Sequence, residues 1–295
     1  MNITVLGASG FVGYNLSCAL SQKGFHVVGS DIEKIADYKA RFVTADMREM
    51  NDVARAIAGS EAVVHLAAHQ LRDSLRDPRM NAEVNILGTL NVLEACRKEG
   101  VKKIIFSSAS SIIGQPLRNP VDEEHVCNPK TPYAVTKLAV EHYLSLYQEI
   151  YGLNYLVFRF FNIYGPHQKD GLIPNFLTRL VKGQPVQIFG NGDQVRDYVY
   201  VNDLTPIFEK ALREPIQNTT VNIGTGRGAT IMEVLNAASK VVGKEPLIEW
   251  KDRQKGEIGN FVADTRKLEQ LFGTVPGTPL DDGIRRTYDW VKGIL

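Results

Sequence analysis

A chain of 295 residues is long enough to bury a large core, as one domain or as a domain with a smaller lobe. Its net charge of +1 gives no electrostatic footprint for nucleic acid or an anionic membrane, and no apolar run approaches the roughly 18 residues of a membrane span. Cys18, Cys96 and Cys127 have neither metal-binding spacing nor a disulfide pattern. With a strand expected from residue 2 and no room for a signal peptide, we expect a reducing cytoplasmic setting and no metal.

Residues 2–31 follow the order strand, glycine turn, helix, strand, acid. Residues 2–6 and 25–29 are short apolar runs with β-branched residues, typical of buried strands, and the second run ends at Asp31. The glycine turn between them permits close approach of a pyrophosphate to the N-terminus of the helix. Asp31 can accept hydrogen bonds from both ribose hydroxyls and would repel a 2′-phosphate, so the pattern predicts NAD rather than NADP. The alternative is a tight turn without a ligand.

Strands and helices continue to alternate up to about residue 165. Strands are expected at 41–45, 62–66, 102–107 and 153–159, and helices at 49–58, around 80–99 and from Tyr133 to about Tyr151. This order predicts an α/β fold with a Rossmann-type, doubly wound parallel sheet. Past Pro166, glycine and proline become frequent, with helices expected at 174–183 and 230–242 and strands at 186–189, 199–201 and 220–223.

The rise in glycine and proline past Pro166 predicts that the chain has two parts. We expect an NAD-binding domain over residues 1–165 and a smaller, partly interleaved α/β substrate lobe over residues 166–295. A cofactor and a substrate would meet in a cleft between two such lobes.

Tyr133 and Lys137 are four residues apart, which places both side chains on one face of a helix. A tyrosine with an ordinary pKa of about 10 is a poor base at neutral pH, but a nearby ammonium favours the phenolate. Such a pair also occurs by chance on many amphipathic helices. Downstream of a motif that can hold a hydride acceptor, it predicts a phenol that transfers a proton during a redox reaction.

With these motifs in place, the chain resembles the extended short-chain dehydrogenase/reductase family, and within it the nucleotide-sugar 4-epimerases of the UDP-glucose 4-epimerase type. The resemblance covers nearly the whole chain. Besides the glycine turn, matching segments lie at 65–68, 85–89, 106–108, 132–137, 159–166, 189–192 and 196–199. The resemblance implies an NAD-dependent isomerase that acts on a nucleotide sugar.

The resemblance also assigns residues to the cofactor. Asp31 would bind the adenosine ribose, Lys137 would bond the nicotinamide ribose, and Phe161 would press on one face of the nicotinamide. The full implied set is Gly7, Gly10, Phe11, Val12, Gly13, Asp31, Asp46, Met47, Leu66, Ala67, Ala68, Asn85, Ser107, Tyr133, Lys137, Phe160 and Ile163. The structural alternatives are tight strand packing for Ala67 and Ala68, a core position for Phe161 and a helix brace for Asn85.

A second implied set would contact the substrate. Asn162 and Arg196 would hold the diphosphate, and the strand at 186–188 would border the nucleoside. The arginine that clamps the diphosphate in the family aligns with Gln254, and Arg253 replaces it if the loop shifts by one residue. The implied set is His69, Ser111, Asn162, Val186, Gln187, Ile188, Arg196, Tyr198 and Arg253. The alternatives are a surface ion pair for Arg196 with Asp197 and no functional contact for His69, while His65 is expected to be structural.

The segment after the strand at 102–107 distinguishes sibling reactions of the family. Sugar 4,6-dehydratases carry Asp and Glu at the positions of Ser110 and Ser111, and related decarboxylases and epimerase/reductases carry Glu or Cys at the second position. Because a serine hydroxyl cannot replace carboxylate chemistry at neutral pH, the resemblance implies 4-epimerisation without elimination. The hydroxyl that many 4-epimerases have at the position of Ala109 is missing, so we expect Ser111, or else Ser108 or Ser110, to replace it.

Other functions and an oligomeric state remain to be tested. The same tyrosine and lysine would serve a net NAD-dependent nucleotide-sugar dehydrogenase or 4-keto reductase, and the fold would also serve a non-catalytic NAD-binding scaffold. The resemblance implies a homodimer, in which the helix around 88–99 and the helix of Tyr133 form a four-helix bundle with their symmetry mates. Val140, Leu144 and Tyr147 would supply its apolar stripe, unless they face the core of their own chain.

Overall fold

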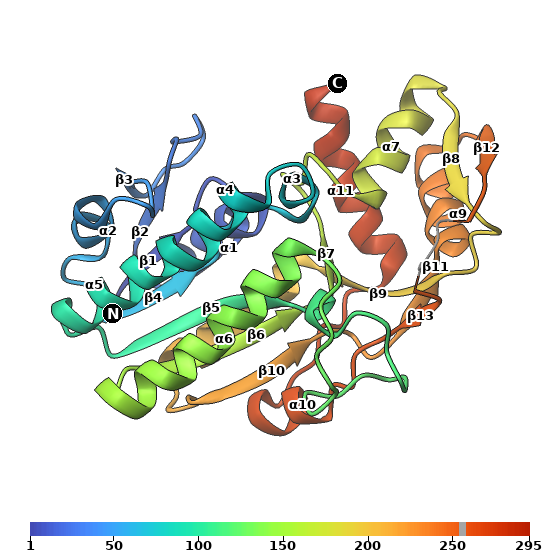
Figure 1. Cartoon of the computed structure of the whole chain (residues 1–295). Coiled ribbons are helices and arrows are strands. Elements are labelled where there is room, and N and C mark those ends of the chain that lie inside the picture. The colour runs from blue at the N-terminus through green and yellow to red at the C-terminus, as the bar shows by residue number, and fades with distance from the viewer. Residues whose placement is uncertain (254–257) are drawn as a thin grey trace. The chain divides into compact units, whose positions relative to one another are not determined.

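The first unit of the protein is built on a parallel sheet (Figure 1). In a computed structural model that describes residues 1–253 and 258–295, seven strands lie in the order β3-β2-β1-β4-β5-β6-β10. They are β1 (Asn2–Leu6), β2 (His26–Asp31), β3 (Arg41–Thr44), β4 (Ala62–His65), β5 (Lys103–Ala109), β6 (Asn154–Phe160) and β10 (Thr219–Ile223). Every pairing from β3 to β6 is parallel. The strand order reverses between β1 and β4, which is the position where doubly wound sheets bind ligands.

Helices cover both faces of this sheet. They are α1 (Phe11–Gln22), α2 (Met50–Ile57), α3 (Leu71–Ser74), α4 (Pro78–Ala82), α5 (Thr89–Glu99), α6 (Pro132–Tyr151) and α8 (Leu204–Arg213). Successive residues of a strand face opposite sides of a sheet. Val157 therefore joins the core under α2, α5 and α6, whereas the ring of Phe158 meets Phe208 of α8 with centroids 5.0 Å apart.

The apolar stripe expected at a dimer interface lies in this core instead. Val140 and Leu144 are each 1% exposed, and Tyr147 is also buried, within the cluster that α6 shares with α5 and the sheet. The stripe therefore faces the interior of its own chain, and the expectation that these three residues supply an interface is wrong. The stripe was misassigned because periodicity shows that a helix has an apolar face but not what covers it.

The expected helix around 80–99 is continuous but not uniform. A π-helical turn, η1 (Glu83–Gly88), lies between α4 and α5. Wide turns of this kind occur mostly inside α-helices and are frequent at functional sites. The helix α6 has clear ends: Thr131 accepts a hydrogen bond from the backbone N–H of Ala134, Pro132 occupies the first turn, and Gly152 ends the helix in the left-handed conformation.

The second unit has a smaller sheet. Among the described residues, β9 (Val195–Tyr200) pairs with β7 (Asn162–Tyr164), β11 (Gly228–Thr230) and β13 (Asn260–Phe261), and β8 (Val186–Phe189) pairs with β12 (Ile248–Lys251). Helices α7 (Leu172–Lys182), α9 (Ile231–Val242) and α11 (Leu280–Ile294) pack together around one apolar core. The chain also forms α10 (Arg266–Phe272) and the short 3₁₀ turns η2 (Ser110–Ile113) and η3 (Val201–Asp203).

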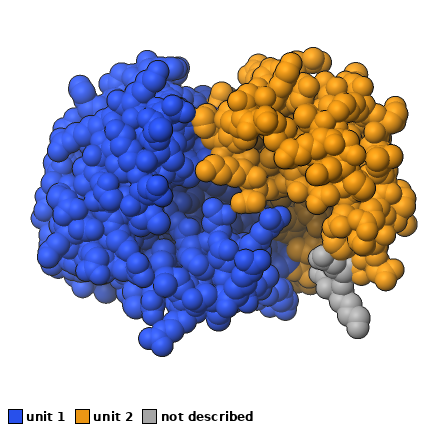
Figure 2. Space-filling model, turned by 90° about the horizontal axis from the view of Figure 1, so that it is seen from above, with its two compact units in different colours: residues 1–114, 126–160, 205–221 blue, residues 115–125, 161–204, 222–295 orange. Residues whose placement is uncertain are grey.

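The two units interleave along the chain, and each of them is made of three separate segments. Figure 2 colours them separately: residues 1–114, 126–160 and 205–221 form the first, and residues 115–125, 161–204 and 222–295 form the second. Residues 205–221 belong to the first unit because α8 covers its sheet and β10 extends it. Residues 115–125 belong to the second, where Val121 pairs with Ala263. None of the described helices is long and apolar enough to cross a bilayer.

Candidate active site

The turn between β1 and α1 requires glycine at two positions. Gly7 has a φ of +84°, and a Cβ added there would lie 2.6 Å from the backbone nitrogen of Ala67. A Cβ added to Gly13 would lie 2.1 Å from the carbonyl oxygen of Gly7. The helix α1 starts after Gly10 with no side-chain cap and no acidic residue in its first turn. Its N–H groups and dipole can therefore bind an anion, and this geometry fits the pyrophosphate of a dinucleotide.

Asp31 at the end of β2 is tied to the same turn. Its Oδ2 accepts a hydrogen bond from the backbone N–H of Ser9 at 3.0 Å, and its Oδ1 accepts one from Ile32 at 2.8 Å. Burial raises the pKa of Asp31, and the two backbone hydrogen bonds oppose that rise. A partly buried carboxylate beside the glycine turn fits the hydroxyl donors of a ribose, as expected from the sequence.

Asp46 and Met47 follow β3. The carboxylate of Asp46 is paired with the guanidinium of Arg48 at 2.5 Å, and hydrogen bonds from Arg48 lower its pKa. Met47 is buried against Gly88, where an added Cβ would lie 3.0 Å from the Met47 Cβ. The predicted contact of both residues with the cofactor remains a prediction.

Two buried asparagines hold the segment that follows β4. Asn85 accepts a hydrogen bond from the backbone N–H of His69 at 2.7 Å and donates one to its carbonyl oxygen at 3.1 Å. Asn81 donates to the same oxygen at 2.9 Å. The side chain of Asn85 thus fixes the backbone next to Leu66, Ala67 and Ala68, which agrees with a bracing role. The Nδ1 of His69 is buried and has no hydrogen-bond partner within the described structure.

His65, at the end of β4, is structural, as the sequence suggested. Its ring is fully buried, its Nε2 lies 2.9 Å from the hydroxyl of Thr89, and it packs against Phe106. Burial lowers the pKa of His65 to about 3, with Lys137 acting in the same direction. The imidazole is therefore neutral near pH 7.

Tyr133 and Lys137 lie on one face of α6. The Lys137 Nζ donates a hydrogen bond to the carbonyl oxygen of Ser107 at 2.6 Å, and it lies 4.5 Å from the ring centroid of Phe106 and 5.5 Å from that of Tyr133. Burial lowers the pKa of Lys137 to about 7, while the charge of Glu141 raises it. Burial raises the pKa of Tyr133 to about 12, although part of its surface stays exposed.

The structure thus differs from the expectation that Lys137 lowers the pKa of its neighbouring phenol. Taking the phenol out of water disfavours the phenolate. The lysine by itself does not outweigh this effect; its Nζ donates a hydrogen bond to the carbonyl oxygen of Ser107.

Polar side chains hold Tyr133 in place, and of these the sequence singled out only Asn85. The hydroxyl of Thr136 lies 2.9 Å from the carbonyl oxygen of Tyr133 and accepts a hydrogen bond from Asn85 at 3.0 Å. The backbone N–H of Tyr133 donates to the hydroxyl of Ser74 at 3.3 Å. A buried network therefore connects the start of α6 to the segment after β4. Asn81 lies in α4 and Asn85 lies in the π-helical turn that follows it, so this one helical stretch carries both amides.

The end of β5 and the start of η2 carry two buried hydroxyl groups that have no hydrogen-bond partner in the described part of the chain. The Oγ atoms of Ser108 and Ser111 are buried and have no hydrogen-bond partner among the described residues, whereas Ser107 donates to the carbonyl oxygen of His65. Ser111 lies on η2, which packs against α6. Buried hydroxyls normally have a partner, so these two fit a polar ligand. Ala109 between them contributes only a methyl group.

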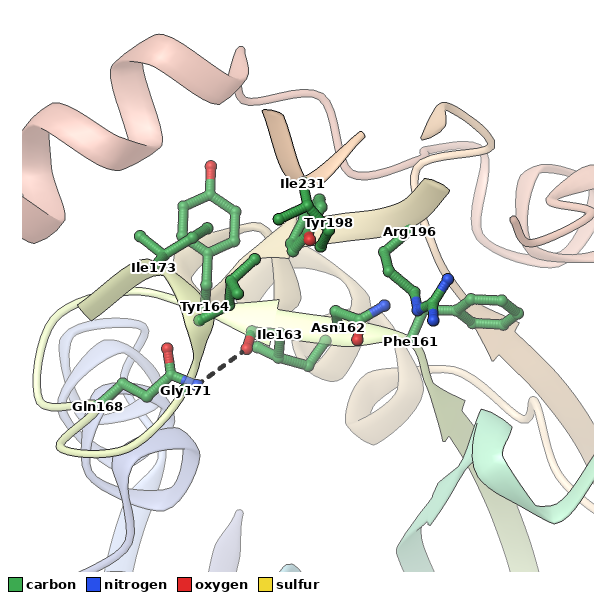
Figure 3. A pocket seen from close by; sticks show the side chains of 11 residues that line it. Phe161, Asn162, Ile163, Tyr164, Gln168, Gly171, Ile173, Arg196, Tyr198 and Ile231 are labelled. Atoms are coloured by element: carbon green, nitrogen blue, oxygen red, sulfur yellow. Dashed lines mark hydrogen bonds between the residues drawn. The ribbon is translucent and has the colours of Figure 1, made fainter. Parts of the chain in front are cut away.

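The second unit contains a cavity of about 390 Å³ between β7, β9 and α7 (Figure 3). Asn162 and Arg196 lie together at one end, as Figure 3 shows, and Gln168 lies at the other. Asn162 donates to the carbonyl oxygen of Asp197 at 3.0 Å, and Arg196 donates to that of Gly259 at 3.0 Å. The pocket offers an amide and a guanidinium to an anionic ligand. The structure thus brings together Asn162, Arg196, Tyr198 and Ile163 of the predicted set.

Asp197 is a residue whose importance the sequence did not reveal. It is fully buried and accepts hydrogen bonds from the backbone N–H groups of Thr225, Gly226 and Ala263 and from the hydroxyl of Thr225. The alternative of a surface ion pair between Arg196 and Asp197 is therefore excluded. Asp197 instead fixes the strand that carries Arg196 and Tyr198.

The other predicted residues have mostly structural surroundings. Phe161 stacks on Phe261 with centroids 5.2 Å apart, and Phe160 packs against Phe208. Val186 and Ile188 are buried in the core, and Gln187 is exposed and bonded to Glu249. Arg253 forms an ion pair with Asp193, and Gln254 lies outside the described residues. Contact of these residues with a cofactor or substrate remains a prediction.

A glycine turn, a partly buried acid and a lysine-bearing helix on a doubly wound sheet define a nucleotide-binding α/β protein of the dehydrogenase and epimerase class. The family model of the NAD dependent epimerase/dehydratase family matches residues 3–224, and the chain belongs to that family. This membership confirms the predicted family, the Rossmann-type fold and NAD as the cofactor.

Three similar proteins illustrate the relationship. A putative UDP-glucose 4-epimerase of Methanocaldococcus jannaschii is 34% identical over 302 residues, which cover 98% of each chain. The structure of Thermus thermophilus UDP-glucose 4-epimerase in complex with NAD matches with a TM-score of 0.90 and 34% identity over 100% of both chains. That of Bacillus cereus UDP-glucuronic acid 4-epimerase with UDP-glucuronic acid and NAD matches with a TM-score of 0.92 and 29% identity over 100% of both chains.

Proposed function

We propose that this protein catalyses the NAD-dependent 4-epimerisation of a nucleotide sugar, of the UDP-glucose/galactose or UDP-glucuronate type, through a 4-keto intermediate. The observation that carries the proposal is the pair on α6, where Lys137 is bonded to the end of β5 and Tyr133 lies one helical turn before it. The similar proteins named above are 4-epimerases of these two sugar types, which supports the same assignment.

Tyr133 moves the proton in this reaction. Its phenol oxygen takes the proton of the sugar 4-hydroxyl as the 4-keto sugar forms and gives it back when the sugar is reduced. The glycine turn and Asp31 would hold NAD, which would supply the hydride acceptor and the later hydride donor for C4 of the sugar. The chain therefore needs no net oxidant or reductant, and its own groups only bind, orient and transfer one proton.

Lys137 supplies the positive charge beside the phenol. Because burial raises the pKa of Tyr133 to about 12, a phenolate forms near neutral pH only when positive charge accumulates beside it. The ammonium of Lys137 and the positive nicotinamide ring both act in that direction. The hydrogen bond to Ser107 fixes the position from which the ammonium acts.

The end of β5 favours epimerisation over elimination. No carboxylate stands at Ser110 or Ser111, so general acid–base chemistry at a neighbouring sugar carbon has no group to perform it there. The hydroxyl of Ser111, which has no partner within the described structure, donates to the sugar O4 in place of the group missing at Ala109. Ser108 is the second candidate for this contact.

Asn162 and Arg196 anchor the substrate diphosphate. Both lie at one end of the cavity of the second unit, on strands that Asp197 ties together. A guanidinium suits the bidentate geometry of phosphate oxygens. With the diphosphate held, the 4-keto sugar turns over and presents its other face to the hydride donor.

The protein forms a homodimer through α5 and α6, although not through the stripe first expected. These helices pack against each other, and their outer surface carries exposed apolar residues. Leu146 and Ile150 on α6 are 44% and 57% exposed, Val135 is 51% exposed, and Leu87 just before α5 is 56% exposed. An isologous contact between two copies of this surface would bury all four residues.

Incubation with a panel of nucleotide sugars tests the proposed function. The protein is supplied without added cofactor, and the products are separated by chromatography. We expect conversion of a UDP-hexose or UDP-hexuronate to its 4-epimer, with no accumulation of free NADH. Stoichiometric NADH would instead indicate a net dehydrogenase, and binding of NAD without conversion of any sugar would indicate a non-catalytic scaffold.

A further inference from the structure

A buried ion pair lies one helical turn beyond Lys137. Arg159 of β6 holds both carboxylate oxygens of Glu141, with Nη2 and Oε2 2.8 Å apart and Nε 3.1 Å and 3.3 Å from the two oxygens. Each side chain is 8% exposed. Because residues four apart share one face of a helix, Glu141 continues the line of Tyr133 and Lys137 along α6.

Stability alone does not account for this pair. Removing two charges from water costs several kcal/mol per ion, and replacing a buried pair with apolar side chains of similar volume is often neutral or stabilising. A fixed pair of charges does act strongly on an ionisable group beside it, because the surroundings of low polarity screen it weakly. One ionisable group beside this pair is Lys137, whose side chain is also buried.

We propose that Glu141, fixed by Arg159, is a positioning residue that keeps the ammonium charge on Lys137. The role of that charge in catalysis rests on the proposed function, whereas the charge itself can be measured without any turnover. Glu141 acts through the lysine and contacts neither substrate nor cofactor.

The described groups that meet Lys137 from the neighbouring strands carry no charge near pH 7. The strand β5 presents the ring of Phe106 and the carbonyl of Ser107. The strand β4 presents His65, which is neutral because burial lowers its pKa to about 3. Burial raises the pKa of the Cys127 thiol next to the ion pair. On α6 itself, Tyr133 is a neutral phenol near pH 7.

The protonation of Lys137 is therefore finely balanced. Burial brings its pKa down to about 7, and Glu141 opposes that fall. Loss of the carboxylate in Glu141→Gln should lower the titration midpoint of Lys137 by roughly one pH unit. Loss of the guanidinium in Arg159→Met leaves the carboxylate unopposed and should raise the midpoint. The two single variants should shift in opposite directions.

The titration of Lys137 by NMR tests the proposal directly. The protein is produced with isotope-labelled lysine, and the ε-carbon resonance of Lys137 is assigned by its loss in Lys137→Met. We expect a lower midpoint than wild type in Glu141→Gln and a higher one in Arg159→Met. Because Glu141→Gln leaves a buried guanidinium unpaired, its folding is the weak point of the design. The double variant Glu141→Gln/Arg159→Met avoids this problem, and its midpoint should lie below that of Arg159→Met.

Opposite shifts separate an electrostatic role from a structural one, since loosened packing would move both single variants in the same direction. Equal midpoints in all variants, or shifts of the same sign, would overturn the proposal. With a nucleotide sugar that the protein converts, turnover should fall at high pH, and the midpoints of that fall should rank the variants in the same order as the midpoints of Lys137. If no sugar is converted, the proposed function fails while the titration of Lys137 still decides the role of Glu141.

Discussion

At the scale of single residues, the chemistry of this site depends on how burial sets the charge of two side chains. Burial brings the pKa of Lys137 to about 7 and that of Tyr133 to about 12. The phenol is therefore neutral near pH 7, although Lys137 is its neighbour on α6. Additional positive charge must stabilise the phenolate. In the proposed reaction, this requirement links proton transfer at Tyr133 to a bound, positively charged cofactor.

The first residue-scale prediction concerns the hydroxyl missing at Ala109. Ser111→Ala should lower kcat by about 10- to 100-fold, because a hydrogen bond to a charged or developing oxyanion contributes roughly 1.5–3 kcal/mol. Ser108→Ala is the matched control, since its hydroxyl is also buried without a partner in the described structure. Steady-state kinetics with the substrate found in the panel will rank the two variants. A larger loss in Ser108→Ala would transfer the role to that residue.

The second residue-scale prediction concerns the choice of cofactor. Asp31→Asn should weaken NAD binding by about tenfold and narrow the gap between NAD and NADP, because the neutral amide no longer repels a 2′-phosphate. Asp37→Asn, on the exposed loop that follows β2, changes the same charge without this contact. Calorimetric titration of both dinucleotides measures the effect. An unchanged preference in Asp31→Asn would remove Asp31 from the ribose site.

Individual site residues could be predicted where a short motif determines the role. Tyr133, Lys137 and the three glycines were found from spacing and from the family resemblance. Asp197, Asn81, Thr136 and Glu141 were missed, because each acts through a partner distant in sequence. A buried aspartate bonded to three backbone N–H groups looks in sequence like any aspartate beside an arginine.

At the scale of elements, the turn between β1 and α1 determines whether a dinucleotide can approach. Gly13→Ala should abolish NAD binding or destabilise the fold, because its Cβ would lie 2.1 Å from the Gly7 carbonyl oxygen. Gly10→Ala is the matched control, since its Cβ would lie 3.2 Å from the same atom. Thermal unfolding with and without NAD compares the two. Equal NAD-induced stabilisation of both variants would contradict the tight packing of this turn.

Most elements of the first unit follow from periodicity, because parallel strands buried on both faces give clear apolar runs. The π-helical turn within 80–99 could not be predicted from the sequence. Its residue Asn85 bonds to the backbone of His69, and this contact exists only in the folded chain. The apolar stripe of α6 was detected but assigned to the wrong surface. What covers a helix face depends on tertiary packing rather than on the helix itself.

At the scale of the whole molecule, the chain crosses repeatedly between two compact units. The sequence predicted a boundary near residue 165 with partial interleaving, but not which segments interleave: β10 joins the first sheet although residues 161–204 of the second unit precede it. Such pairing depends on contacts between distant segments, which local patterns do not encode. Similarity to whole 4-epimerase chains therefore predicts the architecture better than the local composition of the sequence does.

Association of two copies is a property of the whole molecule. Leu146→Glu should convert a dimer into a monomer, because it places a charge in the centre of the exposed apolar surface of α6. Leu117→Glu is the control, because Leu117 is 81% exposed and belongs to neither α5 nor α6. Sedimentation velocity distinguishes the two. A wild-type protein that is already monomeric at micromolar concentration would refute the dimer.

The central claim is that hydride leaves C4 of the sugar and returns to the same carbon. A nucleotide sugar that carries deuterium at C4 tests this claim most directly, with the product analysed by NMR and mass spectrometry. We predict a 4-epimer that keeps its deuterium at C4, with no transfer to water and no release of reduced cofactor. Tyr133→Phe should still bind NAD, but its turnover should fall by about a hundredfold or more. Loss of the label to solvent, or deuterium in free NADH, would contradict the account.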